Sequence, residues 1–203
     1  AYLSHLTDQP AFNVQKAERA LLLARDIPGM DARLTLRPGS VEGEVIGEVQ
    51  VVRMPYMFDF AVRNYGTRDV GRWAGVARAQ LAGLTGMGDL TTISYYGTPD
   101  FDEQKVLQLA HEMRLGRNGL RVGASYSRAW TRPDIAGLDI RSDAQIFGLF
   151  AHYPLVLSQS RRVNIGGGFD VINQDVRFAN FALNQDRLRV AYVRADAGWV
   201  DPA

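Results

Sequence analysis

The feature that most limits how this chain folds is a series of runs in which apolar and polar residues alternate. Eight runs, most of them about ten residues long, follow one another from position 58 onward, separated by clusters of Gly, Asp, Asn and Pro. Successive side chains of a strand point to opposite faces, so this period of two predicts strands with one apolar and one polar face. The runs are 58–65, 73–84, 90–97, 105–115, 120–130, 144–155, 162–177 and 187–200.

The length of these runs favours strands that cross a membrane. Transmembrane strands need ~9 to 11 residues, whereas strands of soluble proteins usually have ~5 to 6. Short connections (86–89, 116–119) also alternate with longer polar ones (98–104, 131–143, 178–186), as in outer-membrane barrels. The predicted fold class is therefore mainly β, with about eight antiparallel strands forming part of an outer-membrane β-barrel over residues 56–203.

Residues 1–55 combine helical periodicity with short strand-like runs, which predicts a separate α+β unit. Asn13 is a candidate N-cap for a helix with apolar residues at helical spacing, and Pro28-Gly29 is expected to end it. Two strand-like runs, 32–37 and 43–52, follow on either side of a Pro38-Gly39 turn.

The composition excludes several classes of protein. The chain has 23 basic and 22 acidic residues, a balance that does not predict a nucleic-acid-binding surface. Cysteine is absent, which excludes disulfides and zinc–thiolate sites. No run approaches the ~20 apolar residues of a membrane-spanning helix. The sequence has no recognisable signal peptide, and we expect both ends to be truncations.

Candidate catalytic, metal-binding and phosphate-binding residues are scarce. His5, His111 and His152 lack the spacing of a metal site. The segment 123–127 is one residue short of a nucleophile elbow, and the glycines at 166–168 have no neighbouring lysine or helix. The sequence therefore predicts no enzyme activity, no cofactor, no metal and no small-molecule substrate.

Four short motifs, in order along the chain, resemble one family. Residues 21–29, 36–39 and 43–45 resemble the last POTRA domain of two-partner secretion transporters, the haemolysin-activator family. Asn-Tyr-Gly-Thr-Arg-Asp-Val-Gly at 64–71 resembles the motif of that family's first barrel hairpin. Gly-Met-Gly-Asp at 86–89 and Tyr-Pro-Leu at 153–155 are similar to a turn and a strand end that follow there.

The resemblance implies a transporter of the outer bacterial membrane with its N-terminal unit in the periplasm. Its barrel has about sixteen strands, of which this chain would hold the first half. Its partners would be outer-membrane lipid and a secreted haemolysin-type or adhesin-type protein in extended form, captured by β-augmentation or beside the helix. Our candidate capture residues are Lys16, Arg19, Arg33, Thr35 and Arg37.

A second set of candidates follows from the alternation itself. Polar residues in the rows opposite the apolar ones are expected to face a water-filled lumen. They are Arg78, Gln80, Gln108, Glu112, Arg114, Arg121, Ser125 and Arg189. Two alternatives stay open: an assembly factor for other outer-membrane proteins with the same architecture, and a soluble ligand-binding barrel of lipocalin type.

Overall fold

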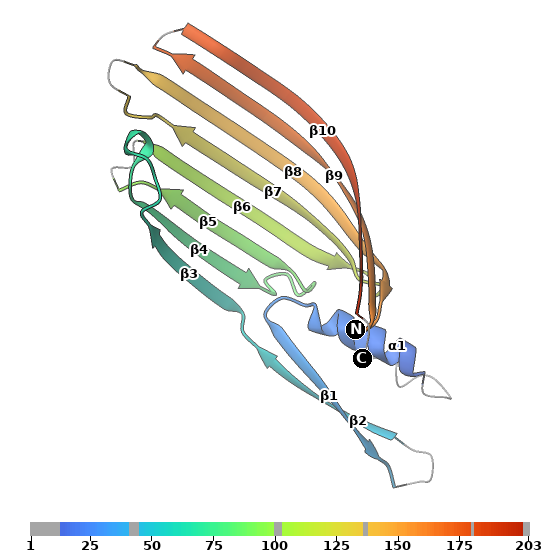
Figure 1. Ribbon diagram of the computed structural model, residues 1–203. Coiled ribbons are helices and arrows are strands. Elements are labelled where there is room, and N and C mark those ends of the chain that lie inside the picture. Colours follow the sequence, from blue (N-terminus) through green and yellow to red (C-terminus); the bar gives the residue numbers. More distant parts are fainter. Residues whose placement is uncertain (1–12, 41–44, 100–102, 136–137, 180, 201–203) are drawn as a thin grey trace.

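The structure is a single-layer antiparallel sheet of eight strands preceded by a helix and a separate pair of strands (Figure 1). The computed structural model describes residues 13–40, 45–99, 103–135, 138–179 and 181–200. The first unit comprises α1 (Val14–Arg25), β1 (Met30–Pro38) and β2 (Val45–Arg53). The large sheet comprises β3 (Tyr56–Arg63), β4 (Ala74–Ala82), β5 (Leu90–Gly97), β6 (Gln104–Leu115), β7 (Leu120–Thr131), β8 (Ile140–Leu157), β9 (Arg161–Phe178) and β10 (Phe181–Trp199).

The first unit forms as its sequence predicts. The side chain of Asn13 accepts a hydrogen bond of 3.0 Å from the backbone N–H of Lys16, which satisfies one of the free donors at the start of α1. The helix ends at Arg25, and Gly29 then takes a φ of 64° to turn the chain into β1. β1 and β2 pair in one register from Met30 opposite Arg53. Within the described residues, no helix is long and apolar enough to span a membrane.

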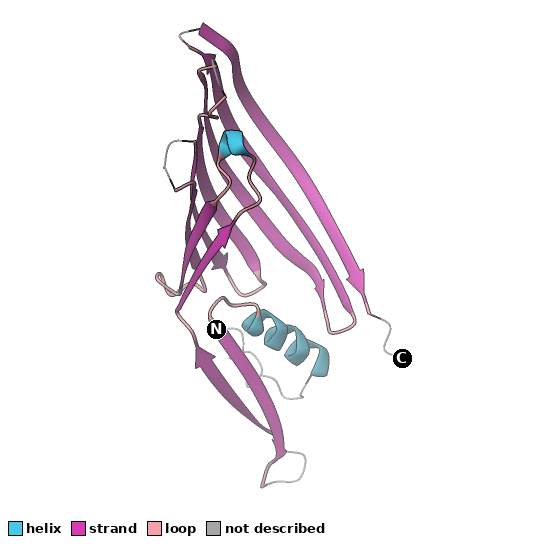
Figure 2. Ribbon diagram, turned by 60° about the vertical axis from the view of Figure 1, so that its left-hand side comes forward, coloured by secondary structure: helices cyan, strands magenta, loops and turns pink. Residues whose placement is uncertain are grey.

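The large sheet is a meander in which each strand pairs with the next, in the order β3 to β10. We call the end where α1 lies the helix end, and the opposite end the loop end. The turns 83–89, 116–119 and 158–160 lie at the helix end. Figure 2 shows that the sheet is one curved layer and that α1 lies across its helix end without covering either broad face.

Two predicted loops at the loop end are shorter than expected. β8, β9 and β10 have 18, 18 and 19 residues, so they extend into the segments 131–143 and 178–186 that the sequence indicated as loops. Only residues 179–180 separate β9 from β10. These extensions carry polar residues on both faces, which removes the alternation, while the backbone pairing continues with one irregularity between Ala182 and Asn184.

In the part of the chain that the structure describes, no second layer packs on the large sheet. Among the described residues, only six apolar side chains are buried: Ala17, Leu23, Ala24, Ala32, Ala74 and Leu157. The accessible surface is 13937 Å², whereas a compact protein of this mass has about 9,500 Å². Among the described residues, most apolar side chains of the sheet therefore stay partly exposed, with only neighbouring strands beside them.

The turn between β4 and β5 is fixed by a buried carboxylate. Asp89 is fully buried and accepts hydrogen bonds from the hydroxyl of Thr85 at 2.6 Å and from its backbone N–H at 3.0 Å. Burial alone raises the pKa of Asp89, but the hydrogen bonds from Thr85 outweigh it, so the pKa is lowered from its usual value. Gly86 and Gly88 have φ of 77° and 63°, conformations that other residues rarely adopt.

We predict that Asp89→Ala lowers the free energy of unfolding by about 1–3 kcal/mol at pH 7, because it leaves the Thr85 donors without their acceptor. Since the folded pKa is depressed, the stabilisation by Asp89 is present above the unfolded pKa and is lost as the pH falls through the folded pKa. The difference between wild type and variant should therefore shrink below pH ~4. Urea unfolding at pH 7 and pH 3 measures both effects. The control is Asp134→Asn, an exposed carboxylate; an equal loss there would contradict the account.

Candidate functional site

The strand register divides the large sheet into an apolar face and a polar face. Residues directly opposite each other on paired strands point to the same face. The apolar face therefore includes Phe58, Phe60, Ala77, Ala79, Ile93, Leu107, Leu109, Met113, Val122, Tyr126, Phe147, Leu149, Phe169 and Val193. The polar face includes Asp59, Arg78, Gln80, Thr92, Ser94, Gln108, Glu112, Arg114, Arg121, Ser125, Ser127, His152, Asp170 and Arg194. The polar face also carries some apolar residues nearer the loop end: Ile146, Ile172 and Leu188.

The apolar face is open along its length. Leu109, Phe147 and Leu149 in the middle of the sheet are 40%, 42% and 47% exposed. Nearer the loop end the same face becomes charged, where Arg128 forms an ion pair of 2.9 Å with Asp143 and lies 4.6 Å from the ring centroid of Trp130. The apolar residues thus form a band that ends in an aromatic and charged border.

Seven of the eight candidate lumen residues lie on one face, as the register shows. Arg78, Gln80, Gln108, Glu112, Arg114, Arg121 and Ser125 belong to the polar face. Arg189 was placed there wrongly: it lies opposite Val171, which lies opposite Phe147, so it belongs to the apolar face. Arg187, two residues away on the same face, shares a row with Asn173, Gln145 and Arg128. Arg189 therefore lies beside the charged border.

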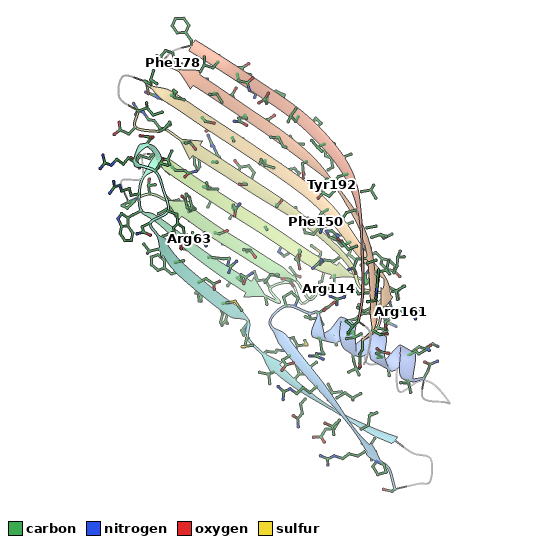
Figure 3. All side chains as sticks on the ribbon, viewed as in Figure 1. Arg63, Arg114, Phe150, Arg161, Phe178 and Tyr192 are labelled. Carbon is green, nitrogen blue, oxygen red and sulfur yellow. The ribbon has the colours of Figure 1, made fainter. Side chains whose placement is uncertain are left out.

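A row of glycines on the polar face makes room for aromatic rings. Gly123, Phe150, Gly168 and Tyr192 lie opposite one another on β7 to β10. A Cβ at Gly123 would clash with the Phe150 ring, and one at Gly168 would clash with the Tyr192 ring and lie 2.7 Å from the carbonyl oxygen of Leu149. Ring packing thus explains Gly168 and also Gly166, where an added Cβ would clash with the His152 ring. Gly167 faces the other side of the sheet, where an added Cβ would lie 3.0 Å from the carbonyl oxygen of Tyr192. Figure 3 shows Phe150 and Tyr192 on this part of the sheet.

The next row toward the helix end is basic. Arg114 lies directly opposite Arg121, which lies opposite His152, then Gly166 and Arg194. We call these four side chains, Arg114, Arg121, His152 and Arg194, the basic row. They line a hollow of about 440 Å³ that is also bounded by Asp26, Arg162 and Asp196. Like charges directly opposite each other destabilise a sheet, and here Arg114 is compensated by carbonyl acceptors and Arg121 by Glu112 at 3.7 Å.

Helix α1 closes one side of this hollow. Arg162 forms an ion pair of 3.1 Å with the carboxylate of Asp26, which follows the last residue of α1. Arg114 donates to the carbonyl oxygen of Gly88 at 2.6 Å and to that of Asp26. Figure 3 shows Arg114 beside α1. The C-terminal end of the helix is therefore held by two arginines of the polar face.

The candidate capture residues do not form one surface. Arg33, Thr35 and Arg37 are exposed and lie on one face of β1, and Lys16 is exposed on α1. Arg19 instead points to the large sheet, where it donates to the carbonyl oxygen of Pro154 at 2.7 Å. On the opposite face of β1, a groove of about 640 Å³ runs between α1 and β1. Its apolar lining includes Leu21, Leu22, Leu34 and Leu36.

Within the described residues, no group of His, Cys, Asp or Glu is arranged to hold a metal. His111 lies 2.8 Å from the hydroxyl of Thr91 across the β5–β6 pair, and His152 packs against Phe150 with ring centroids 5.4 Å apart. His5 lies outside the described residues. The sequence analysis missed Arg162 and Arg194, although each follows the two-residue alternation of its strand.

The fold matches solved outer-membrane barrels. CdiB from Escherichia coli superposes with a TM-score of 0.75 at 16% identity, over 94% of this chain and 37% of that one. CdiB from Acinetobacter baumannii gives 0.62 at 11%, over 92% and 41%. BamA from Haemophilus ducreyi lacking POTRA domains 1–3 gives 0.52 at 12%, over 93% and 38%. The chain therefore has the fold of part of an outer-membrane β-barrel.

The match extends over less than half the length of each of these solved structures. No protein-family model matches the sequence, and no curated protein matches it. The low identities mean that the shared feature is the fold.

Because a methyl group at Gly168 must displace the Tyr192 ring, we predict that Gly168→Ala lowers the free energy of unfolding by about 1–3 kcal/mol. The matched control is Gly198→Ala on β10, where an added Cβ meets nothing within 4 Å. It should change stability by less than about 0.5 kcal/mol. Urea unfolding in lipid vesicles measures both, and equal losses would contradict the ring-packing explanation.

Proposed function

We propose that this chain forms part of the wall of a transporter in the outer membrane of a Gram-negative bacterium. The observation that carries the proposal is the apolar band left open by the described residues, whose side chains would lose contact with water when lipid covers them. The opposite face, with Arg78, Gln108 and Arg121, would line a water-filled lumen, where charges cost little. A soluble barrel of lipocalin type would place the apolar face inside instead.

The strand lengths agree with a bilayer crossing. β6 and β7 have 12 residues each, which at ~3.3 Å per residue is ~40 Å. A tilt of ~40° reduces the height that they span to ~30 Å, the thickness of the hydrocarbon core. The extra residues of β8, β9 and β10 at the loop end would then extend beyond the membrane, where both faces are wet.

We further propose that the transported substrate is a secreted partner protein in extended form. CdiB, the protein of two of these solved structures, is a two-partner secretion transporter. Residues 1–55 would be the C-terminal part of a periplasmic POTRA domain and residues 56–203 the N-terminal half of the barrel. The transporter would have no catalytic role and no cofactor, because translocation would draw on the folding of the partner outside the cell.

The first unit offers two surfaces for an extended chain. β1 and β2 form a sheet of only two strands, so each strand has one edge without a partner in that sheet. An exposed edge can add a strand through backbone hydrogen bonds. The groove between α1 and β1 could take apolar side chains of the same segment. Lys16, Arg33, Thr35 and Arg37 lie on the exposed parts of this unit.

A second candidate is the assembly of other outer-membrane proteins. It is supported by the similarity to BamA, although that superposition is weaker than those with CdiB. Both functions use a sheet with one apolar face and one polar face, so the geometry of the described residues favours neither function.

We predict that Leu109→Arg destabilises the barrel in lipid by about 2–4 kcal/mol, because it places a charge in the middle of the apolar face. Gln108→Arg, one residue away on the polar face, is the matched control and should be nearly neutral. The measurement is the amount of folded protein in the outer membrane of a deletion strain that carries each variant. If Gln108→Arg is as harmful as Leu109→Arg, the assigned faces are wrong.

The same strains separate the two candidate functions. With Leu109→Arg, the export proposal predicts that one secreted protein disappears from the medium while other outer-membrane proteins keep their normal levels. A general loss of outer-membrane proteins would overturn the export proposal in favour of assembly.

A further inference from the structure

Two features of the basic row do not stabilise the sheet: two arginines face each other, and one of them is only weakly paired. Arg114 and Arg121 face each other across the β6–β7 pair, a repulsive arrangement that costs stability. Arg121 forms an ion pair of 3.7 Å with Glu112, a separation that is too long for a strong charged hydrogen bond. Arg121 can therefore exchange this weak pairing for a closer carboxylate.

The hollow as a whole carries a surplus of positive charge. Its lining includes four guanidinium groups (Arg114, Arg121, Arg162 and Arg194) and two carboxylates (Asp26 and Asp196), which gives a formal net charge of +2 with His152 neutral. The volume of about 440 Å³ accommodates side chains rather than a folded domain. Its chemistry fits the carboxylates of a polypeptide.

The spacing of the row suits an extended chain. Arg121 on β7 and Arg194 on β10 are three strands apart, ~14 Å at ~4.8 Å per strand. In an extended peptide, residues i and i+4 point to the same side and are also ~13–14 Å apart. Two acidic residues four positions apart would thus reach both ends of the row.

Two carboxylates already form ion pairs in this hollow. Asp196 lies 3.1 Å from Arg194 on the same strand, and these side chains are 48% and 66% exposed. Asp26 of the first unit forms an ion pair with Arg162, and both side chains are about half exposed, at 48% and 50%. An exposed ion pair contributes little stability because water solvates both charges. A segment that offers several carboxylates could therefore replace Asp26.

We propose that the basic row binds an acidic, extended segment of the translocating polypeptide. This segment displaces Asp26 from Arg162 and so weakens the attachment of α1 to the large sheet. This inference rests on the proposed function, because it names the chemistry of the partner at the lumen face. Arg121 and Arg194 hold the segment, which competes with Asp26 at Arg162 and with Asp196 at Arg194.

The test measures binding of fluorescein-labelled eight-residue peptides to the full chain folded in detergent micelles, by fluorescence anisotropy at low salt. An alternating Asp-Ser peptide should bind more tightly than the Asn-Ser and Lys-Ser peptides. Arg121→Gln and Arg194→Gln should each weaken its binding by about tenfold, since each removes a charged hydrogen-bond donor. Asp26→Asn should strengthen binding, because it removes the competitor.

The matched control is Arg161→Gln, the neighbour of Arg162, whose position opposite Trp199 puts it on the other face of β9. This variant should bind the acidic peptide as the wild type does. Equal weakening by Arg161→Gln, or equal binding of all three peptides, overturns the proposal. Displacement of the peptide by an equal concentration of inorganic phosphate also overturns it, because the site would then suit any small anion.

Two further measurements keep the result interpretable. First, the shift in gel mobility between heated and unheated samples identifies folded barrel for every variant. Second, Arg121→Lys should bind the peptide more tightly than Arg121→Gln if the positive charge is what matters. The outer-membrane levels of Leu109→Arg and Gln108→Arg report on the proposed membrane wall independently. A failure of peptide binding alone therefore refutes the basic-row proposal and leaves the transporter proposal intact.

Discussion

The rest of the structure depends on one constraint, which is that a sheet with an apolar face must have that face covered. Among the described residues nothing covers it: Leu109, Phe147 and Leu149 stay about 40% to 47% exposed in the middle of the sheet. α1 lies across the end of the strands rather than over that face. In the proposed membrane wall, lipid would cover the apolar side, and water would solvate the arginines and glutamines on the polar side. The edges at β3 and β10 also need partner strands in lipid, where unpaired backbone groups are costly.

Local sequence signals predicted the local structure well. The Asn13 cap, the helix end before Pro28 and the alternating runs at 90–97, 105–115 and 120–130 all correspond to elements of the structure. Each depends on residues close together in the chain, where spacing carries the information. The prediction of a long loop at 178–186 was wrong, because alternation disappears where both faces of a strand meet water although hydrogen bonding goes on.

Features that depend on register could not be read from spacing alone. Arg189 was assigned to the polar face because it stands in an alternating run, but only the pairing with Val171 shows which face that row joins. Arg114 and Arg121 flank a tight turn, and the alternation of their strands predicted that both belong to the polar face. Arg194 joins them only through three successive hairpins, and the contact of Arg162 with Asp26 joins segments that are 136 residues apart. The basic row therefore forms only when the strands pair in this register, which residue spacing alone does not reveal.

The most direct test of the two-faced wall uses the absence of cysteine from the chain. Single cysteines introduced along β6, from Val106 to Met113, carry nitroxide spin labels, and the protein is folded into lipid vesicles. Electron paramagnetic resonance then compares the accessibility of each label to oxygen, which concentrates in lipid, and to a water-soluble nickel chelate. The account predicts high oxygen accessibility at Leu107, Leu109 and Met113 and high nickel accessibility at Gln108 and Glu112. Equal accessibility to nickel at all of these positions would contradict it.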